Sequence, residues 1–340
     1  MTLIKSKNLL ISNMSVKSII IGTGSHLPKR ILTNQDLEKM VDTSDEWIRT
    51  RSGIEQRHIV SDGETNSYLA AEAGKKALDM AGVKPYDLDL IIVGTFSPDM
   101  PMPSVACLVQ NRLGAKKAGA FDLYASCSGF LYALSVADNF IRNNKKMKVL
   151  VIGSEVLSMR TNWKDRTTCV LFADGAGAAV LTGTKENRGI LSSHLHSDGS
   201  LGDLLTIKGL GTAYPVTEEI LQKGWQYIQM EGKEVFKYAV KALESAAWEA
   251  LEANGWSSDH VDLLIPHQAN IRIINYMRER LGLSEDKVFI NIHKYGNTSA
   301  ASIPIAMDEA NRAGRLTPGT RLLMVAFGGG FTWGSLAMIW

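Results

Sequence analysis

The sequence predicts an α/β protein built from two similar halves. Runs rich in branched aliphatic residues alternate with helical patterns, and their nearly continuous apolar character is typical of strands buried on both faces in a parallel or mixed sheet. The predicted strands are 17–24 (KSIIIGTG), 88–95 (LDLIIVGT), 148–155 (KVLVIGSE), 261–267 (VDLLIPH) and 321–330 (RLLMVAFGGG). A chain of 340 residues is long enough for two compact units, each with its own apolar core.

The plan of helix, turn and strand occurs twice. Residues 67–95 follow it first and residues 242–267 follow it again, so that Asp89 matches Asp262 (262 − 89 = 173). The tripeptide RLG, which begins at Arg112, recurs at a similar offset (280 − 112 = 168). Any two α/β units share some likeness, but two matched anchors at nearly constant offset favour duplication of a βαβ-type unit.

The domain organisation follows from this repeat. We expect a disordered extension or a misassigned start at residues 1–15, a first half at 16–186 and a second half at 187–340. The boundary is expected in the polar, glycine-containing stretch 183–191.

Composition excludes several classes of protein. With a net charge of +2 and 45% hydrophobic residues, the chain is neither disordered nor a basic nucleic-acid binder. Its three cysteines lack paired spacing, which favours a reducing compartment and hence the cytoplasm. The absence of CxxC and HExxH motifs predicts no metal site, and no apolar run approaches the ~20 residues needed to span a bilayer.

Cys127 is the candidate nucleophile. The stretch 119–125 reads as a strand and 128–141 as a helix, which places Cys127 in a tight strand-to-helix turn. A helix N-terminus presents free N–H groups and a partial positive charge, so we expect it to stabilise the thiolate. Taken alone, the stretch fits a small buried packing residue as well, and Cys107 and Cys169 are interpreted in that way.

Three further features can face the same cleft. His267 ends a predicted strand, and Asn297 follows a glycine just before small residues that can start a helix. Each has an ordinary alternative, a structural histidine and a capping or turn asparagine. The three glycines at 328–330 allow backbone N–H groups to approach a reacting carbonyl, although a plain glycine turn between strands fits equally.

Six motifs, in this order, closely resemble the 3-oxoacyl-(acyl carrier protein) synthase III family, whose members start type II fatty acid synthesis. They are DTSDEWIRTRSGI, SCSGF, DGAGAAVL, PHQANIRII, GNTSAAS and AFGGGFTWGS, and the likeness extends from Val16 to Trp340. The resemblance implies a thiolase-like fold of five layers, αβαβα, with two duplicated halves and a homodimer. It implies an acyl-CoA primer such as acetyl-CoA and malonyl-acyl carrier protein as substrates, without a cofactor and without a nucleic-acid or membrane partner.

The same resemblance implies roles for residues at matching positions. Cys127 would accept the acyl group, and His267 and Asn297 would bind the malonyl thioester carbonyl. The remaining carried-over positions are Gly329 for the oxyanion hole, Phe327 and Met102 for the acyl pocket, Thr43, Trp47, Arg51, Arg166 and Asn270 for coenzyme A, and Lys237, Arg272 and Arg280 for the carrier protein. Two positions depart from the family pattern: Met102 replaces a common aromatic residue, and Glu279 stands where many relatives carry a base.

The expected reaction is ping-pong acyl transfer through acyl-Cys127, followed by decarboxylative condensation. A papain-type protease shares the order Cys, His, Asn, but its CGSCW-like signature is missing and it does not explain the duplicated halves. Acyltransferases that do not decarboxylate, condensing enzymes of specialised metabolism and a catalytically silent binding subunit share the fold. The complete set of Cys127, His267 and Asn297 favours the initiating synthase.

Overall fold

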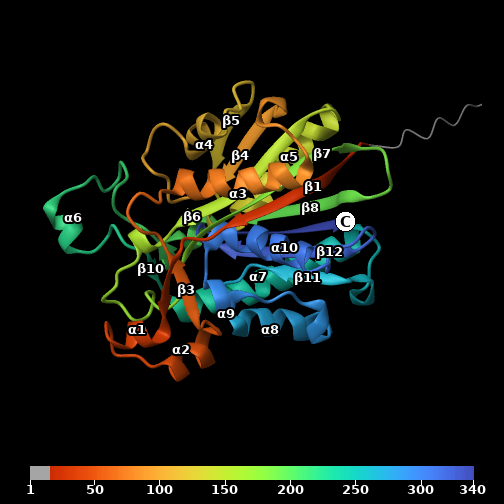
Figure 1. Ribbon diagram of the computed structural model, residues 1–340. Helices are drawn as coiled ribbons and strands as arrows, with labels where there is room; N and C mark the ends of the chain where they lie inside the picture. The colour runs from red at the N-terminus through yellow and green to blue at the C-terminus, as the bar shows by residue number, and fades with distance from the viewer. Residues whose placement is uncertain (1–15) are drawn as a thin grey trace, which may run out of the picture.

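The computed structural model describes residues 16–340 (Figure 1). The extension predicted at residues 1–15 lies outside the described residues. Two large sheets dominate the architecture. The first contains, in spatial order, β1 (Lys17–His26), β7 (Asp174–Thr184), β6 (Lys148–Val156), β4 (Leu90–Gly94) and β5 (Gly119–Leu123). The second contains β11 (Leu263–Pro266), β12 (Arg321–Gly328), β13 (Thr332–Ile339) and β8 (Gly189–Ser197).

Helices enclose and separate the two sheets, which gives the five layers αβαβα. The outer helices on the first sheet are α3 (Asn66–Ala81) and α4 (Val105–Leu113); those on the second are α7 (Gly232–Ala253) and α8 (Ile271–Arg280). The central layer consists of α5 (Gly129–Asn143) and α10 (Ser302–Arg312), which contact strands of both sheets. Figure 1 shows α3 and α4 on the upper side of the molecule, α8 on the lower side and α10 between them.

The central helices are apolar around most of their surface because both of their sides are buried. Phe130 and Leu134 of α5 pack in one cluster with Ile303 and Met307 of α10 and with side chains from both sheets. Separate apolar clusters fill the spaces beneath α3 and beneath α7 and α8. The functional side chains described below lie at the ends of the central helices, where these layers meet.

The two sheets have the same topology, which confirms the predicted duplication. β4 is parallel to β5 and β6, and β11 is parallel to β12. Beyond β6, the pairs β6–β7 and β7–β1 are antiparallel, and beyond β12 the pairs β12–β13 and β13–β8 are antiparallel as well. A parallel bridge from Leu264 to Val288 occupies the place that β5 takes in the first sheet. The repeated aspartates also correspond: Asp89 accepts a 2.8 Å hydrogen bond from the N–H of Lys148, and Asp262 accepts one of the same length from Arg321.

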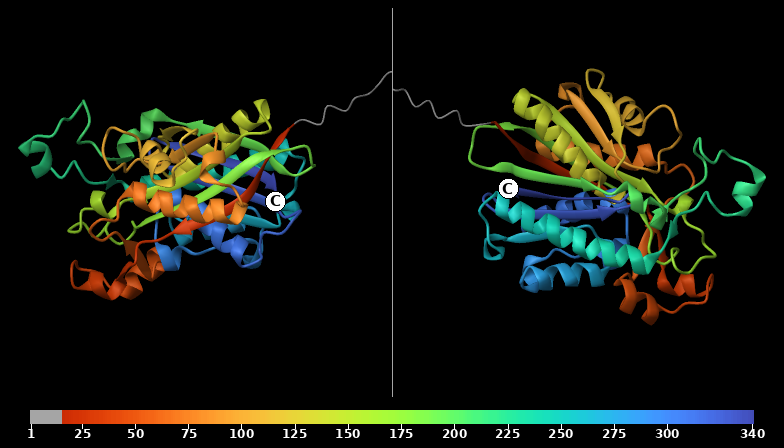
Figure 2. Two further views of the ribbon diagram at one scale, coloured as in Figure 1. Left: turned by 45° about the horizontal axis from the view of Figure 1, so that its top comes forward. Right: turned by 180° about the vertical axis from the view of Figure 1, so that it is seen from behind.

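Smaller elements surround the layers. They are β2 (Arg30–Thr33), α1 (Asn34–Glu38), α2 (Asp45–Ser52), β3 (Gln56–Ile59), β9 (Leu205–Thr206), α6 (Glu218–Gln222), β10 (Gln229–Met230) and α9 (Ile292–Tyr295). The segment around α6 projects from the body in all three views (Figures 1 and 2). The others lie close to the layers, and α2 contacts α8.

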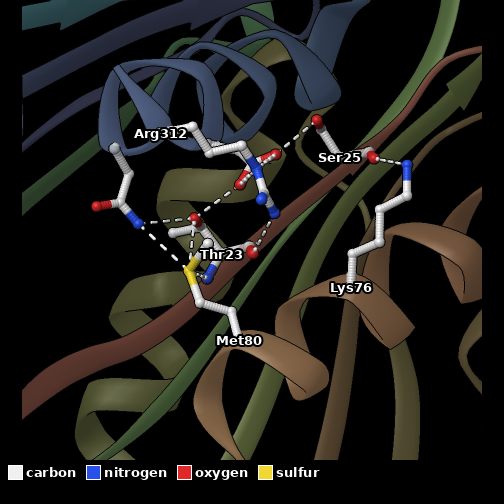
Figure 3. Close-up of polar contacts among 7 residues, drawn as sticks. Thr23, Ser25, Lys76, Met80 and Arg312 are labelled. Atoms are coloured by element: carbon white, nitrogen blue, oxygen red, sulfur yellow. Dashed lines mark hydrogen bonds and ion pairs between the residues drawn. The ribbon is translucent and has the colours of Figure 1, made fainter. Parts of the chain in front are cut away.

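A polar seam joins β1, α3 and α10 on one side of the molecule (Figure 3). The buried carboxylate of Asp308 accepts hydrogen bonds from Thr23 Oγ1 at 2.8 Å, from Ser25 Oγ at 2.7 Å and from Arg312 Nε at 3.0 Å. Lys76 of α3 donates to the carbonyl of Ser25 at 2.7 Å. These contacts tie the first strand of one half to the last helix of the other.

Candidate active site

Cys127 lies in a 3₁₀ turn, Ser126–Ser128, between β5 and α5, as predicted. Ser126 has a left-handed backbone with φ of 46°, a strained conformation that lets the chain turn sharply into the helix. Gly94 at the end of β4 makes the close approach possible, because a Cβ there would lie 2.7 Å from the carbonyl carbon of Gly129. The turn is therefore pressed directly against the sheet.

The thiol of Cys127 is only 8% exposed. Burial raises its pKa to about 12, although the hydroxyl of Ser299 and the backbone N–H groups of Cys127 and Gly329 act in the opposite direction. The expectation that the helix N-terminus keeps the sulfur ionised is therefore wrong for the resting protein. The shift favours the thiol over the thiolate at Cys127.

His267 follows β11 and is buried in the centre of the molecule. Its Nδ1 lies 2.6 Å from Ser302 Oγ at the start of α10, and Ser302 Oγ also accepts from the N–H of Gln268 at 3.3 Å. Burial lowers the pKa of His267 to about 3. The imidazole is therefore neutral at physiological pH, and its position is set by a serine hydroxyl rather than by a carboxylate.

Asn297 belongs to the second half but is held by the first. Its N–H donates to the carbonyl of Leu171 and its carbonyl accepts from the N–H of Ala173, both at 2.9 Å. The side-chain Oδ1 accepts from the N–H of Ser299 at 2.9 Å. This contact fixes the orientation of the amide, and Nδ2 is its donor group.

Two cavities meet at Cys127. The first, of about 350 Å³, has mostly apolar walls that include Phe96, Phe172 and Leu205, and Gly329 also lines it. The second, of about 110 Å³, is lined by the five predicted residues Cys127, His267, Asn270, Asn297 and Phe327. The thiol is thus reached from two largely apolar sides, the second of which also carries the histidine and the two amides.

Met102 lines neither cavity of its own chain. It is 84% exposed in the segment before α4, and this segment is tied to β5 because the N–H groups of Val105 and Ala106 donate to Asp122 at 2.8 and 2.7 Å. β5 is the edge strand of the first sheet. Met102 therefore points away from the protein near an open sheet edge.

The predicted coenzyme A residues form a separate group around α2. The guanidinium of Arg166 lies over the Trp47 ring, with 4.9 Å between its central carbon and the ring centroid, and its Nη1 donates to the carbonyl of Asp42 at 2.7 Å. Thr43 lies just before α2, and Arg51 is exposed one turn after Trp47.

The end of α2 is close to the start of α8, which lies at the second cavity. A Cβ at Gly53, just after α2, would lie 2.6 Å from the Cβ of Ile271, so the helix end packs closely on the start of α8. Asn270 is the N-cap of α8, where its side chain accepts from the N–H of Arg272 at 2.9 Å, and it lines the cavity. The helix that carries Trp47 is therefore packed against the start of α8, whose N-cap residue lines the second cavity.

The three predicted basic residues lie on α7 and α8 but differ in their surroundings. Lys237 is 3.5 Å from Glu234, and Arg280 forms a 2.6 Å ion pair with Glu244. Arg272 instead lies over the ring of Phe236, which lines the second cavity. Of the three, Arg272 is thus the one placed at the cavity.

Sequence reasoning missed three polar residues of the site: Glu155, Ser299 and Ser302. Ser299 Oγ lies 3.2 Å from Cys127 Sγ and 3.3 Å from Glu155 Oε1. The available signal was a charged residue that ends the buried strand 148–155 and serines that follow Asn297. None of these signals indicates contact with a sulfur that is distant in sequence.

Within residues 16–340, no group of three or more His, Cys, Asp or Glu side chains is arranged to hold a metal ion. In the same range, none of the helices combines the length and the hydrophobicity that crossing a membrane requires.

Comparison with known proteins gives one consistent result. Family models described as 3-oxoacyl-[acyl-carrier-protein (ACP)] synthase III and its C-terminal region match residues 121–199 and 251–340. The chain is 54% identical to the beta-ketoacyl-[acyl-carrier-protein] synthase III of Caldanaerobacter subterraneus subsp. tengcongensis, over 94% of this chain and 97% of that protein. It is also 54% identical to that of Desulfotalea psychrophila, over 95% and 99%. The crystal structure of the Aquifex aeolicus 3-oxoacyl-[acyl-carrier-protein] synthase III is 50% identical and superimposes with a TM-score of 0.88, over 95% of this chain and all of that one.

Proposed function

The chain belongs to the 3-oxoacyl-[acyl-carrier-protein] synthase III family, and from this premise we propose how its residues divide the reaction. It is the acyltransferase that initiates type II fatty acid synthesis: it condenses an acyl-CoA primer with malonyl-acyl carrier protein to give 3-oxoacyl carrier protein, carbon dioxide and coenzyme A. The observation that carries the assignment of residues is the position of Cys127 at the junction of two cavities, one of which holds His267 and Asn297.

In the first half-reaction, Cys127 accepts the acyl group. Its sulfur attacks the thioester carbonyl of acyl-CoA, and the backbone N–H groups of Cys127 and Gly329 stabilise the oxyanion. Their closeness to the sulfur supports this role. The apolar cavity with Phe96, Phe172 and Leu205 receives the acyl chain, and acetyl is the proposed primer.

In the second half-reaction, His267 and Asn297 stabilise the enolate. Loss of carbon dioxide from the malonyl thioester places negative charge on the thioester oxygen, which needs preformed donors. A neutral His267 whose Nδ1 accepts a hydrogen bond from the Ser302 hydroxyl presents Nε2–H, and Asn297 presents Nδ2. The resulting carbanion attacks acyl-Cys127, and Phe327 shields the sulfur from water.

Substrate binding is assigned to the surface around the second cavity. The Trp47–Arg166 stack suits the adenine face of coenzyme A, with Thr43 and Arg51 beside it, and Asn270 meets the pantetheine arm. Arg272 at the cavity, with Lys237 and Arg280 on the flanking helices, is proposed to bind the acidic carrier protein. No cofactor takes part in either step.

We further propose a homodimer with β5 at its interface. The open edge of β5, the 84% exposure of Met102 and the 72% exposure of Tyr124 support a partner on this side. Met102 would then reach the acyl cavity of the partner subunit. The three free cysteines and the coenzyme A substrate favour a cytoplasmic location.

The test is to incubate the pure protein with a panel of acyl-CoA esters and to measure the mass added to the Cys127 peptide. We expect acylation at Cys127 and, because an unbranched thioether is adaptable, acetyl and butyryl loading rates within about tenfold of each other, or ~1.4 kcal/mol in barrier. An unmodified Cys127 peptide would overturn the assignment of the nucleophile. A fall in loading rate of more than about tenfold from acetyl to butyryl would contradict only the prediction that the acyl pocket is adaptable.

A further inference from the structure

Glu155 is a fully buried carboxyl group that the proposed reaction does not yet use. It lies on β6 with none of its surface exposed, and none of the described lysine, arginine or histidine side chains forms an ion pair with it. Burying a carboxylate without an ion-pair partner lowers the stability of the fold unless hydrogen bonds compensate for the lost hydration. Its surroundings therefore need an explanation.

One oxygen of Glu155 is held and the other faces the nucleophile. Oε2 accepts from Ser97 Oγ at 2.5 Å, from Thr95 Oγ1 at 3.1 Å and from the N–H of Phe96 at 3.3 Å. Oε1 faces Ser299 Oγ at 3.3 Å. Three donors on one oxygen fix the orientation of the carboxyl group and leave the other oxygen for Ser299.

Ser299 connects this oxygen to the sulfur. Its hydroxyl lies 3.2 Å from Cys127 Sγ and carries a single hydrogen, so it can donate to only one of its two neighbours. When it donates to the Glu155 carboxylate, it can accept from the Cys127 thiol. When Glu155 is protonated, the carboxylic acid donates to Ser299 and the hydroxyl donates to the thiolate.

We propose that Glu155, acting through Ser299, takes up the proton of the Cys127 thiol during acyl loading. The S–H bond breaks as the Ser299 hydroxyl receives the proton and passes its own to Oε1. In the same step the sulfur forms its bond to the acyl carbon, and the bond from that carbon to the coenzyme A sulfur then breaks. The proton returns from Glu155 through the Ser299 hydroxyl to the departing coenzyme A thiolate. Because Glu155 touches no reacting atom, it is a positioning residue. The inference rests on the proposed role of Cys127 as acyl acceptor.

Burial makes Glu155 a better proton acceptor than an ordinary glutamate, because it raises the pKa of this group to about 8. It also raises the pKa of Cys127 to about 12, so the proton transfer is uphill and has to accompany attack of the sulfur on the thioester. The titratable groups that interact with Glu155 are the Cys127 thiol and the Tyr124 phenol, whose pKa is raised first by burial and then by Glu155. His267, whose pKa shift is caused by burial alone, is not coupled to it.

The experiment compares single-turnover transfer of labelled acetyl from acetyl-CoA to Cys127 in wild type, Glu155→Gln, Glu155→Asp and Ser299→Ala. At pH 7.5 we expect loading to fall about 100-fold in Glu155→Gln and Ser299→Ala, the usual size of a general-base contribution, with partial recovery in Glu155→Asp. The wild-type rate should rise with pH and level off near pH 8, whereas the Glu155→Gln rate should keep rising. A matched control is Asp174→Asn, a buried carboxylate of β7 that lines neither cavity and should leave loading within about twofold.

Carbon dioxide release from malonyl carrier protein separates this role from a structural one. Measured in the Cys127→Ala background, it should be unchanged by Glu155→Gln, because His267 and Asn297 remain. Equal losses in decarboxylation and loading would assign Glu155 to the fold and overturn the inference. The inference would also be overturned if Glu155→Gln loaded acetyl at the wild-type rate or faster. In that case the only effect of the Glu155 carboxylate would be to destabilise the Cys127 thiolate by charge repulsion. Absence of label from Cys127 in the wild type would instead overturn the proposed nucleophile.

Discussion

The turn that carries Cys127 and the turn that carries Ser299 have the same backbone but different chemistry. Each begins with a left-handed serine, Ser126 with φ of 46° and Ser299 with φ of 49°, continues through a 3₁₀ turn and enters a central helix three residues later. At the position that follows the serine, the first half has Cys127 and the second has Ala300.

The difference shows how a duplicated framework can divide a reaction. In the proposed reaction the first turn supplies the nucleophile, whereas the second places the Ser299 hydroxyl 3.2 Å from the Cys127 sulfur and lies just after Asn297. Both turns face the same space because the two central helices lie in one layer. The left-handed serine is thus common to both halves, whereas the residues that follow it differ.

The proposed division of the reaction is tested most directly by replacing the functional side chains one at a time. We expect Cys127→Ala to abolish acyl loading while some malonyl decarboxylation remains. Asn297→Ala and His267→Ala should still load acyl groups, but their condensation should fall by about 10² to 10³, the cost of one lost oxyanion donor. Label on the protein and carbon dioxide release are measured separately in a single-turnover assay.

The control for the histidine is His260→Ala, which changes an exposed histidine that lines neither cavity and should leave both half-reactions intact. If His267→Ala lost acyl loading as completely as Cys127→Ala, the two turns would not divide the reaction. His267 would then be the obligatory base for the thiol.

A second prediction concerns the glycines that press each turn against the first sheet. A Cβ at Gly94 would lie 2.7 Å from the carbonyl carbon of Gly129, and one at Gly153 would clash with the carbonyl oxygen of Ala300. We expect Gly94→Ala and Gly153→Ala each to lower the free energy of unfolding by about 1–3 kcal/mol, as overpacking does. Urea unfolding measures both.

Gly199→Ala is the matched control, because nothing lies within 4 Å of a Cβ at that position. Its stability should stay within about 0.5 kcal/mol of wild type. If Gly94→Ala left the free energy of unfolding unchanged while Gly153→Ala lowered it, the first turn would be more adaptable than the second. The two turns would then not be equivalent.

The smallest expected effect is a difference in pH dependence between the two halves. Burial lowers the pKa of His267 from its ordinary 6.5 to about 3, so between these values the unfolded chain binds a proton that the folded chain does not, and stability falls as pH decreases. Burial raises the pKa of Glu155 from 4.5 to about 8, so in that window the folded chain binds the extra proton, and stability falls as pH increases. The two effects oppose each other between pH 4.5 and 6.5.

Of these two groups, only Glu155 contributes to the pH dependence of stability above pH 6.5. We expect Glu155→Gln to gain stability relative to wild type by about 1.5 kcal/mol between pH 6.5 and 8, because one proton corresponds to ~1.4 kcal/mol per pH unit. Denaturant unfolding of both proteins at the two pH values measures this change. A constant difference in stability would show that Glu155 has an ordinary pKa and no shared proton with Cys127.

Much of the fold could be predicted because local patterns and the global repeat agree. The apolar runs around Asp89 and Asp262 become β4 and β11 at corresponding places in the two sheets, and the small residues after Cys127 and Asn297 introduce the two central helices. A motif resemblance extending from Val16 to Trp340 added the layer order, which periodicity alone does not contain.

The electrostatics of the site could not be predicted, because they depend on contacts between distant segments. Ser299 is 172 residues from Cys127 and 144 from Glu155, so no local pattern brings the three together. The helix start after Cys127 correctly indicated a turn that leads into a helix, but the degree of burial, which raises the pKa of the sulfur, is a property of the packed layers. For the same reason, the ion pair of Arg280 with Glu244 became visible only in the structure.

The backbone hydrogen bonds between Asn297 and the segment Leu171–Ala173 have a consequence for the history of this architecture. Through them, the position of Asn297, a residue of the second half, depends on a segment of the first half. A single-half ancestor would have had to form this contact between two separate molecules, at a rate and an occupancy set by their concentration. Within one chain the contact is intramolecular, so Asn297 is held in place whenever the chain is folded, at any protein concentration.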